Sequence, residues 1–320
     1  MMKCKVFADH YSAGFLITLW SHHISFDKLL PIWDYYIITN SPVFHIFTVV
    51  AYILQFRDDL LANEKEEDIF SILTHLPQPN VKQLICDAKN IMNNTPTSFI
   101  STLCNMILGK TNATEESLAQ LNCSLCLYIT PQELLTSCFR DSQYSSQSIK
   151  HSILGKSQNF IHYTIVDIRS EEEYIMSHIK GSRLLSSSLF EDVERLIAEL
   201  PNEQSDEYKR HIVLITNSIQ HNNLAKYLYK KNSKSLLTVA TQAEVINASV
   251  EENNDLLVLQ QFTCLFFQRG YHYVSYCDGG YKAIQELCST LPKEQYQYIF
   301  VETEKKEGND FSIRLMDENR

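Results

Sequence analysis

The stretch that decides the fold of the second half of this chain is Asp167-Ile168-Arg169-Ser170-Glu171-Glu172-Glu173-Tyr174-Ile175-Met176-Ser177-His178-Ile179-Lys180-Gly181. The five residues that end with its first residue, 163–167, read Tyr-Thr-Ile-Val-Asp, and this run is apolar enough to predict a buried strand. Residues 171–176 then predict a short helix. A strand followed at once by a helix is the unit from which α/β domains are built.

The same alternation continues through the second half of the chain. Because the predicted strands are too apolar to have a face in water, we expect a mostly parallel, five-stranded sheet covered by helices on both sides. Thr130 and Glu133 predict a capping box, with Pro131 at the first helical position. The predicted strands are 123–129, 163–167, 183–185, 211–215 and 273–276, and later helices are predicted at 171–176, 190–200, 256–268 and 282–291.

The first 110 residues show helical periodicity only. Ser25 is the expected N-cap of a helix whose apolar residues are spaced to form one buried face, and Trp33 on that face should be buried. The most apolar run, 43–54, predicts a helix buried on all sides. The apolar face is formed by Phe26, Leu29, Leu30, Trp33, Tyr36 and Ile37, and further helices are predicted at 65–74, 81–92 and 97–108, the last ending at Gly109.

The quoted stretch resembles the opening signature of rhodanese-like domains, which combines Asp-x-Arg, an acidic–aromatic pair and His-Ile-x-Gly. Residues 267–283, with their Gly-Gly pair, resemble the closing segment of that family, so the resemblance covers about 122–292. It implies a catalytic cysteine after the fourth strand, but here that position is Thr216 and the loop continues with Asn217 and Ser218. The resemblance gives structural roles to Asp167, Arg169, Glu173, His178, Gly181, Gly279 and Gly280.

No other residue replaces the missing nucleophile. Cys264 and Cys277 do not follow the fourth strand, and a threonine hydroxyl without a neighbouring base is a weak nucleophile. The lone Cys123-x-x-Cys126 pair lacks the second pair, or the histidines, of a structural zinc site, so both are interpreted as buried small hydrophobic residues. We therefore predict neither a metal site nor a cofactor.

The helical half resembles the C-terminal half of a TBC domain. The resemblance rests on segments 15–20 and 30–36, on the apolar helix after them, and on 57–61, with Trp20, Trp33 and Asp34 as its signature. In that family an arginine finger and a glutamine finger in the first half accelerate GTP hydrolysis. No residue here takes either role, and Arg57, at a helix end, is interpreted as a solvated side chain.

The two resemblances set the expected domain organisation. Residues 1–110 are the C-terminal half of a TBC domain, and 111–121 are a linker. The rhodanese-like domain covers 122–302 and carries insertions at 139–160 and 217–253, and residues 303–320 are a disordered tail. The insertion after Thr216 is either a tolerated surface loop or a helix-forming segment that blocks the strand-end pocket.

The composition excludes several classes of partner. With 28 basic and 38 acidic residues, the chain has a net charge of -10 and no basic stripe for nucleic acid or polybasic segment for anionic lipid. The run 43–54 is too short to span a bilayer, which takes about 20 residues. Nine cysteines without a secretory signal suggest reduced thiols in the cytosol.

A TBC domain directly followed by a rhodanese-like domain occurs in few architectures. One also carries an N-terminal kinase-like domain. The short linker and the missing cysteine favour the other. Its members are non-catalytic adaptors that tether endosome-derived vesicles to golgins at the trans-Golgi network and contact the WASH complex through a further C-terminal domain. The resemblance implies a cytoplasmic protein held peripherally at these membranes by its partners. The alternatives are a Rab GTPase-activating protein, whose catalytic half is missing from this chain, and a sulfurtransferase.

Overall fold

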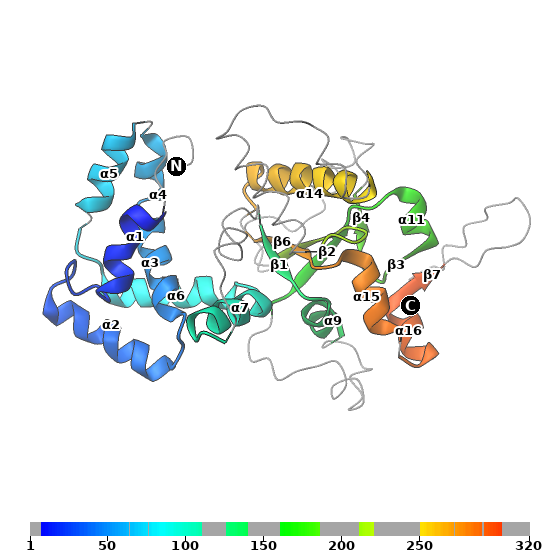
Figure 1. The fold of residues 1–320 in the computed structure, drawn as a ribbon, viewed down its shortest axis with the longest axis horizontal. Helices are drawn as coiled ribbons and strands as arrows, with labels where there is room; N and C mark the ends of the chain where they lie inside the picture. Colours follow the sequence, from blue (N-terminus) through cyan, green and yellow to red (C-terminus); the bar gives the residue numbers. More distant parts are fainter. Residues whose placement is uncertain are drawn as a thin grey trace, which may run out of the picture.

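The computed structural model describes residues 8–63, 65–75, 77–110, 126–139, 161–185, 211–220, 250–271, 273–289 and 291–302. A helical part formed by 8–110 is followed by an α/β part formed by 126–302 (Figure 1). This confirms the predicted fold class. The predicted linker, the helix at 190–200, the tail and most of both insertions lie outside the described residues, so the domain bounds stay predictions.

The helical part contains the predicted helices close to their predicted positions. Additional short helices lie at its start and after residue 56, and Asn80 caps its helix by accepting a hydrogen bond from the Gln83 N–H. Among the described helices, none is long and apolar enough to cross a bilayer. The helices are α1 (Ala8–Ile17), α2 (Phe26–Thr39), α3 (Phe44–Leu54), α4 (Arg57–Ala62), α5 (Glu66–Thr74), α6 (Val81–Asn93) and α7 (Thr97–Ile107).

The core of the helical part is organised around Trp20, whose side chain is fully buried. Its indole N–H donates to the Tyr36 hydroxyl at 3.0 Å, and that hydroxyl lies 2.5 Å from Thr48 Oγ1 on α3. Phe15 and Tyr52 pack around the indole ring. This buried polar chain joins α2 to α3 within an otherwise apolar core.

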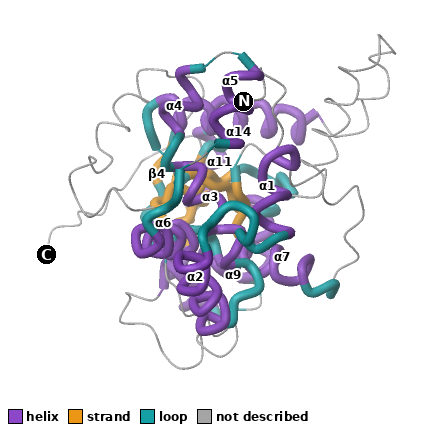
Figure 2. The backbone as a smooth tube through the Cα atoms, turned by 90° about the vertical axis from the view of Figure 1, so that its left-hand side faces the viewer, coloured by secondary structure: helices purple, strands orange, loops and turns teal. Residues whose placement is uncertain are grey.

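The predicted buried face of α2 is wrong in part. Leu29 is buried, but Phe26, Leu30 and Ile37 are exposed, and the buried line continues through Ile32 instead. Apolar residues cover more than one side of this helix, so their spacing identified a shared face without identifying the face that meets the core. α2 packs against α3 and α6 and lies at the outer edge of the helical part (Figures 1 and 2).

Two further predictions about burial need correction. Trp33 is only partly buried, and its indole N–H donates to the Leu19 carbonyl oxygen at 2.8 Å. α3 is not buried on all sides, because Val50 and Leu54 are exposed while residues such as Phe44 and Phe47 are in the core. One side of α3 is therefore exposed to solvent.

The α/β part is built on a five-stranded sheet in the order β1-β6-β5-β2-β4, with every neighbouring pair parallel. The strand Tyr163–Asp167 lies inside the sheet and not at its edge. The strands are β1 (Leu127–Ile129), β2 (Tyr163–Asp167), β4 (Arg183–Leu184), β5 (His211–Ile215) and β6 (Val274–Cys277).

Helices cover both faces of this sheet (Figure 1). One buried cluster lies between the sheet and α14 (Val250–Gln268), and a second lies between the opposite face and the helices α9 (Pro131–Phe139) and α15 (Gly280–Cys288). Every residue of β5 is buried, as expected for a strand covered on both sides. These clusters contain no residue of the helical part, which has its own core.

A small antiparallel sheet was not predicted. β3 (Ser177–Ile179) pairs with β7 (Phe300–Glu302), which follows α16 (Lys293–Ile299) and connects residues far apart in the sequence. Between β2 and β3 lies α11 (Glu171–Met176), the short helix of the quoted stretch. The pairing of β3 with β7 ties the end of the α/β part back to that stretch.

Glu133 joins the two parts of the chain. One carboxylate oxygen accepts from the Thr97 N–H at 2.8 Å and the other from the Ser98 N–H at 2.7 Å, so a side chain of α9 caps the N-terminus of α7. The Ser98 hydroxyl also donates to this carboxylate, as does the Tyr163 hydroxyl at 2.6 Å. The predicted capping box is therefore half present: Thr130 accepts from the Glu133 N–H at 3.4 Å, but the Glu133 side chain turns to α7.

Candidate functional site

The position of the family cysteine lies at the end of β5, at the carboxyl edge of the parallel sheet. Thr216 is there, with its side chain buried, and its hydroxyl oxygen accepts a long hydrogen bond from the Ile219 N–H at 3.4 Å. The segment 216–219 turns sharply and meets the start of α15. Among the described residues, no general base is placed to activate this hydroxyl.

The N-terminus of α15 is already satisfied by the same segment. The Tyr281 N–H donates to the Thr216 carbonyl at 2.8 Å, and the Lys282 N–H donates to the Asn217 carbonyl at 3.0 Å. The two main chains approach so closely that a Cβ on Gly280 would lie 2.4 Å from the Thr216 oxygen, and Gly280 has a φ of +58°. Only glycine fits there, and the helix dipole points at main-chain carbonyls rather than at an open pocket.

The N–H groups of the loop point at a side chain of the protein itself. The Asn217 N–H donates to Asp255 Oδ2 at 3.0 Å, and the main chain of Ser218 stabilises the same carboxylate. Burial raises the pKa of Asp255 and the nearby charge of Glu173 adds to this, outweighing the hydrogen bonds from the loop. Asp255, near the start of α14, thus occupies the place where loop N–H groups would hold an anion.

Glu173 borders this arrangement from the other side. Its carboxylate accepts from the Asn217 side-chain amide at 3.2 Å and from the Ser170 N–H at 3.1 Å, and Ser170 accepts from the Glu173 N–H in return. This is a complete capping box at the start of α11. Burial alone would raise the pKa of Glu173, but the hydrogen bonds from Ser170 and Asn217 and the charge of Arg169 lower it.

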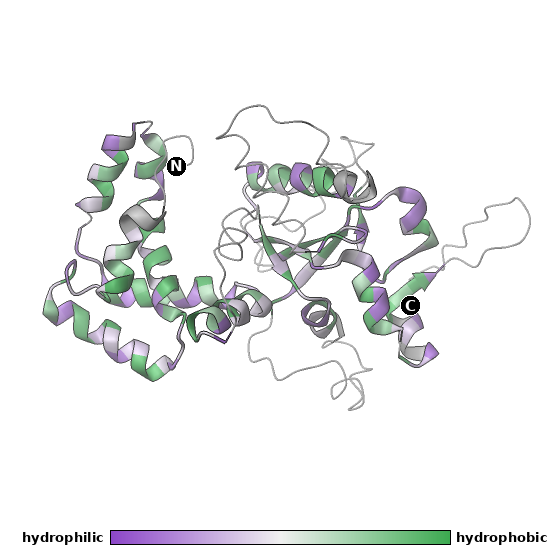
Figure 3. Ribbon diagram, viewed as in Figure 1, coloured by the Kyte–Doolittle hydropathy of each residue, from purple (hydrophilic) through white to green (hydrophobic). Residues whose placement is uncertain are grey.

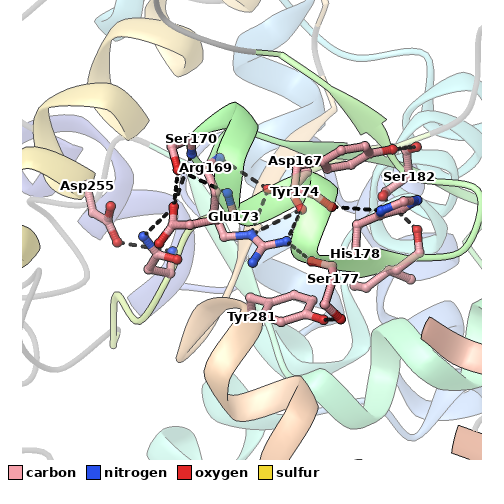
Figure 4. Close-up of polar contacts among 12 residues, drawn as sticks. Asp167, Arg169, Ser170, Glu173, Tyr174, Ser177, His178, Ser182, Asp255 and Tyr281 are labelled. Carbon is pink, nitrogen blue, oxygen red and sulfur yellow. Dashed lines mark hydrogen bonds and ion pairs between the residues drawn. The ribbon is translucent and has the colours of Figure 1, made fainter. Parts of the chain in front are cut away.

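Asp167 and Arg169 form a buried ion pair (Figure 4). Arg169 Nη2 lies 2.7 Å from Asp167 Oδ2, Nε lies 2.9 Å from Oδ1, and Nη2 also donates to the Ser177 carbonyl at 2.8 Å. The guanidinium carbon lies 3.7 Å from the ring centroid of Tyr281, so α15 covers the pair. With both partners buried and bound to each other, the pair ties β2 to α11 and β3 instead of facing a substrate.

His178 has a local role in the same stretch. Its ring stacks on Tyr174 with the centroids 4.0 Å apart, and its Nδ1 lies 2.9 Å from the Tyr174 carbonyl oxygen. The Tyr174 hydroxyl donates to the Ser182 carbonyl at 2.7 Å across the turn that contains Gly181 (φ +81°) (Figure 4). These contacts fix the turn between β3 and β4. Gly279 (φ +74°) similarly forms the turn before α15.

The cysteines are separated in the fold. Cys264 is exposed on α14, and Cys277 is buried at the end of β6. Cys126 is buried, and that burial raises the pKa of its thiol to about 12, as expected of an inert residue; Cys123 lies outside the described part. Among the residues that the structure describes, no group of three His, Cys, Asp or Glu side chains is placed to hold a metal ion.

The residues singled out in the helical part do not form a site together. Trp20 is in the core, Trp33 is partly buried, and Asp34 is exposed on α2. Arg57 opens α4, and its side chain is 57% exposed and near Asp58, which fits the solvated interpretation. Within the described ranges, no arginine is held towards a pocket in this part.

Comparison with known families and proteins supports the resemblance to a rhodanese-like domain and relates the chain to proteins named for a TBC domain. The rhodanese-like domain family matches residues 151–287, which include β2, the quoted stretch, Thr216 and the start of α15. The chain therefore contains a rhodanese-like domain. The parallel sheet covered by helices is consistent with this match.

The relatives found are TBC proteins. A TBC domain-containing protein kinase-like protein from Dictyostelium discoideum is 30% identical over 98 residues, 31% of this chain and 9% of that protein. Proteins of the same name from Mus musculus and Homo sapiens are each 25% identical over 207 residues, 54% of this chain and 22% of the relative. This chain spans less than a quarter of the length of these relatives. The comparisons support a TBC and rhodanese architecture.

The sequence did not predict the roles of two residues. Asp255 binds the loop after β5, and Glu133 connects the helical part to the α/β part. Asp255 follows the predicted insertion, with no local pattern to assign it a partner. A signal for Glu133 did exist: α7 begins after Pro96, which offers no side-chain acceptor, so the first N–H groups of the helix needed one from elsewhere.

Proposed function

We propose that this chain acts as a non-catalytic adaptor that binds proteins through the surfaces of its helical and rhodanese-like parts. The observation that carries the proposal is the end of β5, where Thr216 replaces the cysteine and Asp255 accepts the loop N–H groups. A sulfurtransferase needs a thiolate held by such N–H groups, and neither the thiolate nor the free donors are present among the described residues.

In finer detail, we propose that the chain resembles TBC domain family member 23 and works in membrane trafficking. It would tether endosome-derived vesicles at the trans-Golgi network by binding golgins and WASH-complex components, as a cytoplasmic protein held peripherally at these membranes. The support is the missing cysteine, the short connection between the parts and the resemblance of the helical part to a TBC domain. The kinase-like name of the relatives favours the other architecture and is the main argument against this detail.

A Rab GTPase-activating function is the second candidate, because the relatives are named for their TBC domains. The finger residues of that chemistry have no counterpart in the helical part, so we expect this chain alone to leave Rab GTP hydrolysis unchanged. A sulfurtransferase is the weakest alternative.

Two assays test the proposal. The purified chain should show no thiosulfate:cyanide sulfurtransferase turnover, and any turnover lost on Cys264→Ser or Cys277→Ser would refute the non-catalytic assignment. Immobilised golgin segments should retain the chain, with an unrelated coiled coil as the control. Failure to bind any golgin or WASH-complex segment, together with accelerated hydrolysis by a Rab panel, would replace the adaptor proposal with the GTPase-activating one.

A further inference from the structure

One side of α2 carries a row of exposed apolar side chains. Phe26 is 68% exposed, Leu30 is 42% exposed and Ile37 is 77% exposed, and Trp33 lies between them with its ring partly buried. Their spacing places them along one side of the helix, since residues four, seven and eleven apart fall close together on an α-helix. We call these four residues the α2 stripe. Figure 3 shows α2 at the edge of the helical part, with apolar residues along it.

The α2 stripe is held rigidly. About a quarter of a turn away on the same helix, Leu29 and Ile32 are buried in the core, so α2 cannot turn the stripe inward. The Trp33 indole N–H donates to the Leu19 carbonyl at 2.8 Å, which fixes the ring at the surface. A preorganised aromatic side chain loses little conformational freedom on binding, and tryptophan is enriched among residues that dominate binding energies.

The charges beside the α2 stripe argue against its antiparallel pairing with a second copy of this chain. Asp27 and Asp34 are exposed and seven residues apart, so they lie along the same edge of the stripe. The basic residue of α2, Lys28, is partly buried on another side. Two copies packed stripe to stripe with their α2 helices antiparallel would bring these aspartate edges close together, and like charges at such an interface are unfavourable.

We infer that the α2 stripe binds an amphipathic helix of another protein that carries lysine or arginine along one edge of its apolar face. Apolar residues of that helix would pack on Phe26, Leu30 and Ile37, and its basic edge would lie beside Asp27 and Asp34. This rests on the proposed adaptor function and names the kind of partner segment that one of its surfaces takes. Asp27 and Asp34 select the partner by charge. They attract a helix with basic residues along the facing edge and repel a helix with acidic residues there.

The test uses synthetic helical peptides of about 18 residues, long enough to be helical. They share one apolar face and differ in whether one edge carries Lys, Gln or Glu. Each is labelled and titrated with the full chain, with fluorescence anisotropy and tryptophan emission as readouts. We expect the Lys-edged peptide to bind about tenfold more tightly than the Glu-edged one and to shift the Trp33 emission to shorter wavelength. Trp20 is already buried and should not respond.

Variants locate the binding. Ile37→Asp should abolish it, whereas Leu61→Asp, on another exposed apolar residue that belongs to α4, should leave it unchanged. Asp27→Lys and Asp34→Lys made together should reverse the preference between the Lys-edged and Glu-edged peptides, a result that unfolding cannot produce.

Three results would overturn the inference: equal binding of the three peptides, binding insensitive to Ile37→Asp, or concentration-dependent dimerisation of the chain alone that Ile37→Asp removes, which would assign the stripe to a second copy. If Ile37→Asp leaves retention by golgin segments intact and the peptides do not bind, the stripe inference fails while the adaptor function stands. If no golgin or WASH-complex segment is retained but the Lys-edged peptide binds as expected, the adaptor function fails alone.

Discussion

Replacing Glu133 with alanine should weaken the joint between the helical and α/β parts. The carboxylate accepts two main-chain N–H groups at the start of α7, at 2.8 and 2.7 Å, and two hydroxyls, from Ser98 and Tyr163. Glu133→Ala leaves the first N–H groups of α7 without an acceptor, since Pro96 precedes the helix and supplies none.

The expected loss is about 2–4 kcal/mol of unfolding free energy. A helix N-cap is worth about 1 kcal/mol, and each hydrogen bond to a charged group about 1.5–3 kcal/mol, but these values do not add here because Glu133 is only partly buried and water reaches the freed donors. Glu133→Gln keeps one amide oxygen as an acceptor and should lose about half as much. Urea unfolding followed by far-UV circular dichroism measures both, with Gln132→Ala, on the exposed side of the same helix, as the control.

Hydrogen exchange and a double-mutant cycle distinguish a local loss of the contacts between Glu133 and α7 from a loss of stability of the whole protein. In Glu133→Ala the amides of Thr97 and Ser98 should exchange faster while those of β5 stay protected. A cycle between Glu133→Ala and Ser98→Ala should give a coupling energy above about 0.5 kcal/mol, because the two side chains interact directly. A Glu133→Ala protein as stable as the Gln132→Ala control, with a coupling energy near zero, would refute the role of Glu133.

Further predictions concern the sheet and its carboxyl edge. Burial lowers the pKa of His211 from 6.5 to about 4, so between these pH values the unfolded chain binds a proton that the folded chain does not. The contribution of His211 to the unfolding free energy is therefore fully present above about pH 6.5 and falls by roughly 3 kcal/mol towards pH 4. Urea titrations at each pH should show that His211→Phe removes this loss. Gly280→Ala should cost about 2–4 kcal/mol, because its methyl group would meet the Thr216 carbonyl. Gly181 also has a positive φ but has open space around it, so Gly181→Ala should cost about 1 kcal/mol by the same assay. Thr216→Cys should give a thiol that iodoacetamide alkylates slowly at neutral pH, and adding Asp255→Ala should speed alkylation. A fast-reacting Thr216→Cys thiol would contradict the conclusion that Asp255 occupies the loop N–H groups.

The features of the fold that depend on local sequence could be predicted. Asp167 and Arg169 are two residues apart and bind each other, and the alternation of strand and helix identified each described strand of the main sheet and the parallel arrangement. Gly279 and Gly280 were given structural roles by the family resemblance, and both have positive φ. Such features are set by residues close together in the chain, which is the information that a single sequence contains.

Features that depend on which element covers which surface could not be predicted. The spacing of Phe26, Leu30 and Ile37 predicted a shared face of α2, but the core meets the side that carries Leu29 and Ile32, about a quarter of a turn away. Both sides are apolar, and only the positions of α3 and α6 decide between them.

The long-range polar partners were missed for a related reason. Glu133 has a plausible local partner in Thr130 and a stronger distant one in α7, and the distant one takes the carboxylate. Asp255 meets Asn217 across 38 positions of sequence, most of them outside the described residues. A pattern of residue types predicts that an acidic side chain needs donors, but not which donors the fold brings to it.

The change at the end of β5 extends beyond the absence of a cysteine. In a site that stabilises a thiolate, loop N–H groups and a helix N-terminus must both be free to face the sulfur. Here the Asn217 N–H is bound to Asp255, and the first N–H groups of α15 are bound to the carbonyls of Thr216 and Asn217, so neither kind of donor faces an open position. Restoring a thiol at 216 would place it among satisfied donors and in a buried setting that raises a thiol pKa rather than lowering it. Recovering the chemistry would require moving α14 or α15 as well as changing one residue. This is a reason, independent of residue identity at 216, for the proposal that the domain serves through its surfaces.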